Sequence, residues 1–383
     1  MQLPTSSVRP ASLQMAEIGS EAILDSLPDG VYITDTNRRI LFWNHEAERM
    51  TGWRRSEVVG RRCHDNVLCH IDKDGHLLCG YEHCPLHRAM VTGTSSDLPH
   101  LIFAKCRDGE RIPVEVTVAP LRNPDGEVIG GIEVFRDLSP AFQDLNRARL
   151  IQQETMALVL PEDARVRISV TYTPHDQVGG DFYRAERLPD GRYALLVADV
   201  IGHGLPAALH TMQLRTLWDE GRERLGDPRA FLEWLNQRLA PLADADSGYV
   251  ATGIHAVYDP TTGGYEVGCA GHPPPLVIRK QGGMEAIRAT GPGLGLIDEP
   301  KFSTDPGALE PGDHLVFFTD GAHEVMNYQG EELGEAALKR LIREALLSGV
   351  PDPLGKVEEA ILRFSNEVSL PDDLTLIDLA RTG

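Results

Sequence analysis

The second half of the chain carries a series of apolar runs that stop at, or start from, an aspartate. Six apolar runs in this half have the length and composition of β-strands, and four of them adjoin an aspartate: YALLVAD, ATGIHAVYD, YEVGCAG, PPLVIRK, HLVFFTDG and LTLIDLA. A few helical segments separate these runs, including residues 204–221 and 337–349. This order predicts layered sheets flanked by helices, because a strictly alternating parallel fold would place a helix after almost every strand.

Carboxylates mark the ends of these strands. Asp199 closes YALLVAD, Asp320 closes LVFFTD, Asp181 lies in VGGDFY, and Asp372 and Asp373 precede LTLIDLA. One such aspartate alone is typical of a turn or a cap, but several that converge repel one another unless a cation lies among them. Oxygen ligands select hard ions such as Mg²⁺ or Mn²⁺. Two such ions about 4 Å apart can ready a water for in-line attack on a phosphoryl group, so the pattern predicts phosphoryl chemistry.

Six motifs occur in order in this half of the chain: VGGDFY, VADVIGHG, CAGHPPPLV, GPGLGL, FFTDGAHEVMNYQGEELG and PDDLTLI. Over residues 165–381 they resemble the PPM (PP2C-type) serine/threonine phosphatases, specifically the bacterial SpoIIE/RsbU-type branch. The resemblance implies a four-layer α-β-β-α sandwich, in which two antiparallel sheets hold a two-metal centre between them.

The resemblance also implies a role for each acidic motif residue. Asp199 would bridge two Mn²⁺ or Mg²⁺ ions, and the Val200 carbonyl would complete the second site. Asp320 and Asp372 would hold the first ion, with the adjacent Asp373 as the alternative to Asp372. Asp181 would act mainly through metal-bound water. Metal-bound hydroxide would be the nucleophile, without a covalent intermediate.

Three further positions in these motifs leave alternatives open. His203 would position water or substrate, or else pack as a structural side chain. Arg184 occupies a position where the family usually has an acidic residue. This difference argues against a contact of Arg184 with metal or metal-bound water, and a contact with phosphate remains an alternative. His272 in AGHPPP favours a structural turn.

The first half of the chain has shorter strand-like runs. GVYITDTNRRILFWN predicts a hairpin, HEAERMTGW predicts a helix that ends at Gly52, and residues 99–139 contain three strand-like runs with Asp-Gly turns between them. This order predicts a small antiparallel sheet with one helical face. With GVYITDTNRRILFWNHEAERMTGW and EVVGRRC it resembles a PAS sensor domain over residues 19–137, a fold that holds many ligands or none.

Four of the six cysteines lie in one segment of this domain, CHDNVLCHIDKDGHLLCGYEHCPLH. Their spacing, C-x5-C-x9-C-x4-C, is not a standard zinc-ribbon pattern. One hypothesis is a site for zinc, an iron–sulfur cluster or haem, with Cys63, Cys79, Cys84 and either Cys69 or His70 as ligands. The other is a loop insertion with solvated histidines and buried free thiols.

Composition excludes some classes of partner. The 37 basic and 57 acidic residues give a net charge of −20, which argues against nucleic acid and anionic membranes. No apolar run is long enough to predict membrane insertion. Residues 1–18 show no basic-then-apolar signal pattern, so they predict a flexible tail and favour a cytoplasmic location.

A helix is predicted between the two domains. Ser139 can cap it, Pro140 suits its first position, and Pro161 would end it. The predicted organisation is a tail over 1–18, a PAS domain over 19–137, a linker helix over 138–164 and a phosphatase domain over 165–383. An apolar stripe on the linker would pair in a homodimer or pack against the chain's own domains; its residues are Phe142, Leu145, Ala148 and Ile151.

Together these features predict an α+β protein that acts as a PAS-regulated, metal-dependent serine/threonine phosphatase. By family resemblance, its substrate would be a phosphorylated STAS-type anti-sigma-factor antagonist in a partner-switching pathway. Control would pass through the linker helix to the helix after the metal loop. The alternative is a non-catalytic scaffold that binds a regulatory partner, but the joint presence of Asp199, Asp320 and Asp372 argues against it.

Overall fold

The computed structural model of the protein describes residues 19–73, 75–80, 83–96, 99–202, 204–242, 250–365 and 370–383. The predicted tail, residues 1–18, lies outside these ranges, as does His203. The chain divides into two units, Met1–Asp144 and Leu145–Gly383. The division falls inside helix α5 (Ser139–Met156).

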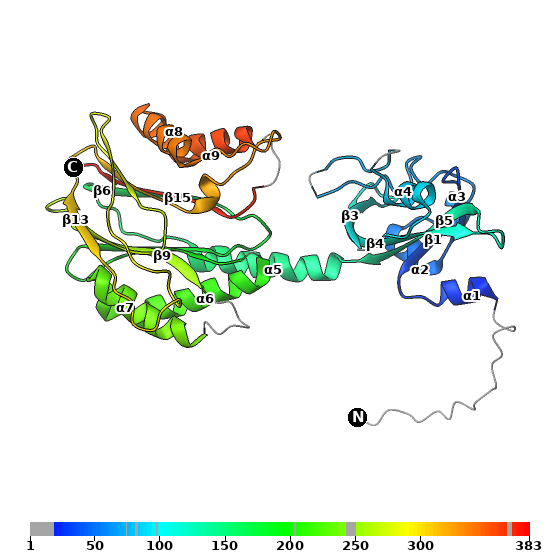
Figure 1. Ribbon diagram of the computed structural model, residues 1–383, viewed down its shortest axis with the longest axis horizontal. Helices are drawn as coiled ribbons and strands as arrows, with labels where there is room; N and C mark the ends of the chain where they lie inside the picture. Colours follow the sequence, from blue (N-terminus) through cyan, green and yellow to red (C-terminus); the bar gives the residue numbers. More distant parts are fainter. Residues whose placement is uncertain are drawn as a thin grey trace, which may run out of the picture. The chain divides into compact units, whose positions relative to one another are not determined.

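One antiparallel sheet organises the first unit (Figure 1). Its described strands lie in the order β2-β1-β5-β4-β3. Their bounds are β1 Gly30–Asp35, β2 Ile40–Trp43, β3 His100–Lys105, β4 Arg111–Arg122 and β5 Val128–Asp137. The helices are α1 Ser20–Asp25, α2 His45–Thr51, α3 Arg55–Val58 and α4 Pro85–Thr92. Gly52 ends α2 in the left-handed region, at φ 73°, as the sequence predicts.

Three aromatic side chains from the sheet pack together in the interior of this unit. Tyr32, Trp43 and Phe135 pack with ring centroids 5.6 to 6.3 Å apart. Cys63 and Cys84 belong to the same buried cluster. The cysteine-rich segment is therefore part of the core of the unit.

Two antiparallel sheets face each other in the second unit. One has the described strand order β13-β10-β9-β8-β7 and the other β12-β11-β14-β15-β6. The first sheet comprises β7 Asp181–Arg187, β8 Tyr193–Val200, β9 Ala251–Tyr258, β10 Gly264–Ala270 and β13 Thr304–Ala308. The second comprises β6 Val166–Thr173, β11 Leu276–Ile278, β12 Met284–Ala286, β14 His314–Phe318 and β15 Leu374–Arg381.

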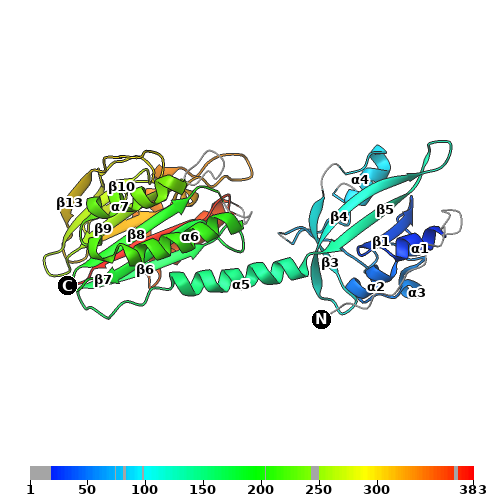
Figure 2. The ribbon, with the colours of Figure 1, turned by 90° about the horizontal axis from the view of Figure 1, so that it is seen from below.

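Helices cover the outer face of each sheet. Helices α6 (Gly204–Glu220) and α7 (Pro228–Leu239) lie on one side of the unit, and α8 (Glu335–Leu347) and α9 (Pro353–Phe364) lie on the other (Figure 1). Figure 2 shows α6 and α7 in front of β8 and β9. Both sheets are therefore buried on two faces, which explains the continuous apolar runs of their inner strands. Along β8, Leu195 and Val197 face the opposite sheet, while Leu196 and Ala198 face the helices.

This architecture is the predicted α+β arrangement, a PAS-type unit followed by an α-β-β-α sandwich. Helix α5 ends at Met156, and the connection from there to β6 has no regular secondary structure. None of the helices formed by the described residues is long and apolar enough to cross a membrane.

Candidate active site

Asp181 and Asp199 lie directly opposite each other where β7 pairs with β8. Asp181 is 1% exposed and faces the second sheet. Its Oδ2 accepts hydrogen bonds from the Thr319 hydroxyl at 2.9 Å and the Thr375 hydroxyl at 2.6 Å. Both threonines follow or belong to strands of the opposite sheet, so this carboxylate joins the two sheets at one end of the interface.

Asp373, which is 2% exposed, holds the loop that leads into β7. Its Oδ1 accepts from the backbone N–H of His175 at 2.6 Å. Its Oδ2 accepts from the backbone N–H groups of Gly180 and Asp181, the latter at 3.1 Å. Both oxygens of Asp373 are therefore engaged by backbone donors.

Asp199, Asp320 and Asp372 form the more open part of the acidic cluster, and each is partly exposed. The pKa of Asp199 is raised to about 7, chiefly by burial and then by the charges of Asp320, Asp372, Asp373 and Glu324, in that order. Burial also raises the pKa of Asp372, with contributions from Asp373 and Asp320. These carboxylates are close enough to repel one another.

Two glycines permit the close backbone approaches at this site. A Cβ on Gly321 would lie 2.1 Å from the Asp373 carbonyl oxygen, so only glycine fits beside Asp320. A Cβ on Gly180 would lie 2.9 Å from the Val200 carbonyl oxygen. The Val200 carbonyl consequently lies beside the loop that positions Asp181.

The donor set fits hard divalent cations. Every effect that acts on the Asp199 pKa raises it, and both burial and neighbouring anions contribute. As they stand, no three His, Cys, Asp or Glu side chains in the described ranges are close enough to hold an ion between them. A cation would supply the attraction that draws the carboxylates together, because it replaces their mutual repulsion.

Arg184, for which the sequence left a phosphate contact open, lies on the opposite face of β7 from Asp181. Side chains alternate along β7, so Arg184 shares the helix-facing side with Phe182, opposite to Asp181. Its Nη1 donates to the Ala157 carbonyl at 3.2 Å. Burial and the charge of Arg215 on α6 lower its pKa.

His272 is buried and its Nδ1 is 2.6 Å from the Thr252 hydroxyl. Thr252 is the β9 partner of Asp199. The histidine thus ties the turn after β10 to the strand beside the acidic cluster. His203, the other histidine of the motifs, falls outside the described residues.

Sequence reasoning missed three side chains at this site. Thr319 directly follows the apolar strand β14 and Thr375 lies within the apolar strand β15, and a polar residue in such a run was the available signal. Gln152 of α5 is buried, and its Nε2 donates to the Gly179 carbonyl at 2.8 Å and the Thr211 hydroxyl at 3.0 Å. Its Oε1 accepts from the Gly179 N–H at 3.2 Å. Gln152 therefore connects the linker helix both to the loop before Asp181 and to α6.

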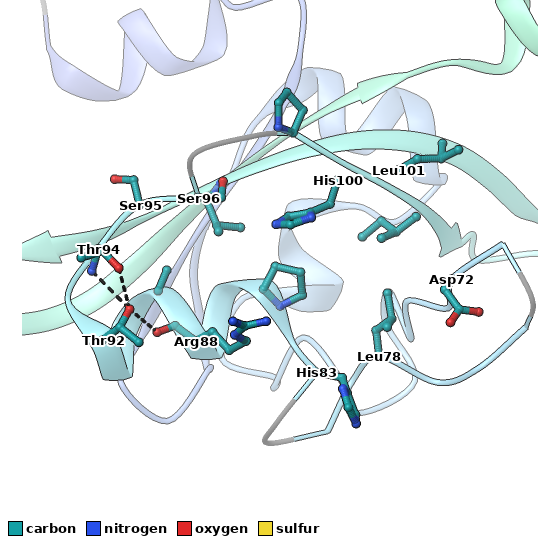
Figure 3. Close-up of a pocket in the computed structure, with 15 residues that line it drawn as sticks. Asp72, Leu78, His83, Arg88, Thr92, Thr94, Ser95, Ser96, His100 and Leu101 are labelled. Atoms are coloured by element: carbon teal, nitrogen blue, oxygen red, sulfur yellow. Dashed lines mark hydrogen bonds between the residues drawn. The ribbon is translucent and has the colours of Figure 1, made fainter. Parts of the chain in front are cut away.

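In the first unit, a cavity of about 690 Å³ lies between α4 and β3 (Figure 3). Arg88 of α4 and His100 of β3 lie on opposite sides of it. Leu78, His83 and Pro85 also line it, so the cavity borders the cysteine-rich segment. In that segment Cys63 and Cys84 are buried, Cys69 and Cys79 are partly buried, and all four are free thiols.

Comparison with known proteins agrees with this architecture. The family model "Stage II sporulation protein E (SpoIIE)" matches residues 189–382, and a PAS fold model matches residues 20–138. The chain belongs to the SpoIIE family. Its predicted PAS domain and SpoIIE-type phosphatase domain are both confirmed.

Two curated relatives and one solved structure extend the comparison. The chain is 27% identical over 265 residues to the phosphoserine phosphatase RsbU of Bacillus subtilis, covering 65% of this chain and 78% of RsbU. It is 25% identical over 263 residues to Protein IcfG of Synechocystis sp., covering 62% of this chain and only 41% of IcfG. The SiaA-PP2C domain of Pseudomonas aeruginosa superposes with a TM-score of 0.55 at 22% identity, covering 63% of this chain and 97% of that domain. This last similarity shows the PP2C-type fold.

Proposed function

We propose that the protein is a PAS-regulated, metal-dependent phosphatase that removes phosphate from serine or threonine of a protein substrate. The observation that carries the proposal is the meeting of Asp199, Asp320 and Asp372 at the end of the inter-sheet core, where the charges of Asp320 and Asp372 help to raise the pKa of Asp199. Two Mg²⁺ or Mn²⁺ ions bound there would ready a water for in-line attack and neutralise charge on the phosphoryl group.

The surroundings of each carboxylate support separate roles. Asp199 would bridge the ions, the Val200 carbonyl would bind the second, and Asp320 and Asp372 would bind the first. Asp372 is favoured over Asp373, because backbone donors engage both oxygens of Asp373. Asp181 has one oxygen engaged by two threonine hydroxyls, which leaves the other to orient a water.

The proposed substrate is a phosphorylated STAS-type anti-sigma-factor antagonist. Loss of its phosphate would allow the antagonist to exchange binding partners and so change transcription. Membership of the SpoIIE family and the similarity to the phosphoserine phosphatase RsbU support this choice. A substrate that controls a sigma factor acts where transcription occurs, so the proposed location is the cytoplasm.

Contacts of the linker helix support control by the PAS domain. Gln152 contacts Gly179, two residues before Asp181, and Thr211 on α6, the helix after the Asp199–Val200 strand end. A displacement of α5 would therefore move the loop that leads into Asp181 and donates hydrogen bonds to Asp373. Leu150 and Ile151 on the same helix are 55% and 60% exposed, which supports a homodimer through the linker.

Turnover of p-nitrophenyl phosphate and of a phosphorylated STAS-domain protein by the purified full chain tests the proposal. We expect turnover with Mn²⁺ or Mg²⁺ and its loss with EDTA. Turnover that survives EDTA would contradict the two-metal site. Metal binding without turnover of either substrate would favour the non-catalytic scaffold.

A further inference from the structure

The core of the PAS unit contains an unusual group of polar side chains beside Trp43 and Phe135. We call it the thiol cluster, and its members are Tyr32, Arg38, Cys63, His70, Cys79, Cys84 and Glu133. Arg38, His70 and Glu133 are 5%, 4% and 1% exposed. Burial of this many polar groups in an apolar core is costly unless they bind one another or a ligand.

Arg38 holds the three cysteines of the thiol cluster together. Its backbone carbonyl accepts from the Cys63 N–H at 3.1 Å, and its Nη1 donates to the carbonyl of Gly80, next to Cys79, at 3.0 Å. Its side chain also hydrogen-bonds with the Cys84 thiol. Arg38 adopts φ 60°, a left-handed conformation that is rare for a residue with a side chain. Arg38 therefore contacts each of the three segments that carry these cysteines, although Cys63 and Cys84 are 21 residues apart in sequence.

Glu133 and His70 provide a second, independent observation. One oxygen of Glu133 accepts from the Tyr32 hydroxyl at 2.9 Å, whereas Oε1 has no hydrogen-bond partner in the described part of the chain. Nε2 of His70 lies 3.7 Å from that oxygen. The backbone N–H of His70 donates to the Cys79 sulfur at 3.0 Å. A histidine that binds zinc through one ring nitrogen usually donates the N–H of the other to a carboxylate. His70, which lies between Glu133 and the thiols, has these neighbours.

We propose that the PAS unit binds one zinc ion through the thiolates of Cys63, Cys79 and Cys84 and the imidazole of His70. Three thiolates and Zn²⁺ carry a net charge of −1, which the Arg38 guanidinium neutralises inside the core. The Cys69 thiol is directed to the His64 carbonyl, 3.5 Å from its Sγ, whereas the His70 backbone already contacts the Cys79 sulfur, so these contacts favour His70. Glu133 would accept the outer N–H of His70 and fix its ring.

The side chains must move together to bind the ion. In the described ranges they are not close enough to share an ion as they stand, and zinc–sulfur bonds of about 2.3 Å require the thiols to lose their protons and converge. The cavity between α4 and β3 gives a path from solvent, because Leu78 and Pro85, which line it, adjoin Cys79 and Cys84.

Metal analysis of the full-length chain tests this site independently of phosphatase activity. The test protein is the full-length chain with the substitution Asp199→Asn, which weakens metal binding at the acidic cluster, and it is purified under reducing conditions. We expect about one zinc ion per chain, lost in Cys79→Ser/Cys84→Ser and in His70→Asn. The matched control is Cys106→Ser, which alters another buried thiol of the same unit. Glu133→Gln should weaken zinc binding roughly 10- to 100-fold.

Because Cys63 and Cys84 belong to the core, a lost metal must be separated from a lost fold. The unsubstituted protein, stripped of metal with a chelator, is titrated with Co²⁺. Sulfur-to-cobalt charge-transfer absorption that zinc abolishes supports the site. Iron with sulfide in place of zinc overturns the zinc assignment, and so does stripped protein that shows no such absorption. Loss of zinc in Cys69→Ser together with its retention in His70→Asn overturns the choice of His70.

Discussion

The two polar clusters of this protein are built in opposite ways. In the phosphatase unit, carboxylates gather where two sheets meet, and both burial and neighbouring anions raise the pKa of Asp199. In the PAS unit, buried thiols lie in an aromatic core, and the buried guanidinium of Arg38 hydrogen-bonds with one of them, Cys84. Hard oxygen donors with excess negative charge suit Mg²⁺ or Mn²⁺, whereas soft sulfur donors beside a fixed cation suit zinc. The comparison indicates that the ligand atoms, oxygen or sulfur, together with the local charge predict which ion a cluster would bind.

The largest expected effect is a loss of turnover in Asp199→Asn, which should leave the thiol cluster unaffected. Asp199→Asn removes the bridging charge without deleting a core group, so turnover should fall roughly 10³-fold or more. Zinc content of the PAS unit should not change. Steady-state kinetics at saturating Mn²⁺ and metal analysis of the same preparation give both values. Near-normal turnover in Asp199→Asn or in Asp320→Asn would refute the assigned roles.

A smaller effect should follow from the hydroxyls that hold Asp181. Thr375→Val leaves the buried Asp181 carboxylate with one donor fewer, which should lower the free energy of unfolding of the phosphatase unit by about 1–3 kcal/mol. Turnover should fall with it. Scanning calorimetry and kinetics measure both effects, and Thr375→Ser, which keeps the hydroxyl, is the matched control. Equal stability of the valine and serine variants would show that this hydrogen bond does not support the cluster.

The contact between the linker helix and the acidic cluster should have a more moderate effect. Gln152→Ala removes the hydrogen bonds to Gly179 and Thr211, so the Mn²⁺ concentration for half-maximal turnover should rise roughly 3- to 10-fold. Gln153→Ala, at the exposed neighbouring position, should leave it unchanged. Deletion of residues 1–137, or charged residues at Leu145 and Ile151, should also alter the rate or the Mn²⁺ requirement. Identical Mn²⁺ dependence in all of these proteins would exclude control through α5.

The smallest expected effect is a loss of stability of the phosphatase unit in acid, caused by protonation of His255. It must be distinguished from the loss of stability that follows loss of metal. Burial lowers the pKa of His255 to about 4, and its ring packs on Phe231 at 4.5 Å. A lowered pKa favours the neutral form in the folded state, so its stabilising contribution is present above pH 6.5 and is lost as the pH falls toward 4. Thermal unfolding between pH 7 and 4 measures this loss. His255→Phe should flatten that dependence, and an unchanged pH profile would contradict the assignment.

The sequence predicted the inner strands of the sandwich and missed its edges. The six predicted runs correspond to β8, β9, β10, β11, β14 and β15, which lie inside the two sheets. The missed strands β6, β7, β12 and β13 are the four edges. An inner strand is covered on both faces and so is continuously apolar, whereas an edge strand tolerates residues such as Pro306 and Gly307 of β13.

Within the site, the sequence by itself determined which residue types stand at the strand ends, since the aspartates and glycines follow apolar runs. Only the tertiary structure decided that Arg184 faces the helices, that backbone donors occupy Asp373, and that Gln152 reaches Gly179. Thr375 and Asp181 are 194 positions apart, and Arg38 and Gly80 are 42 apart. Such contacts depend on the register of strands and the stacking of layers, which local sequence patterns do not encode.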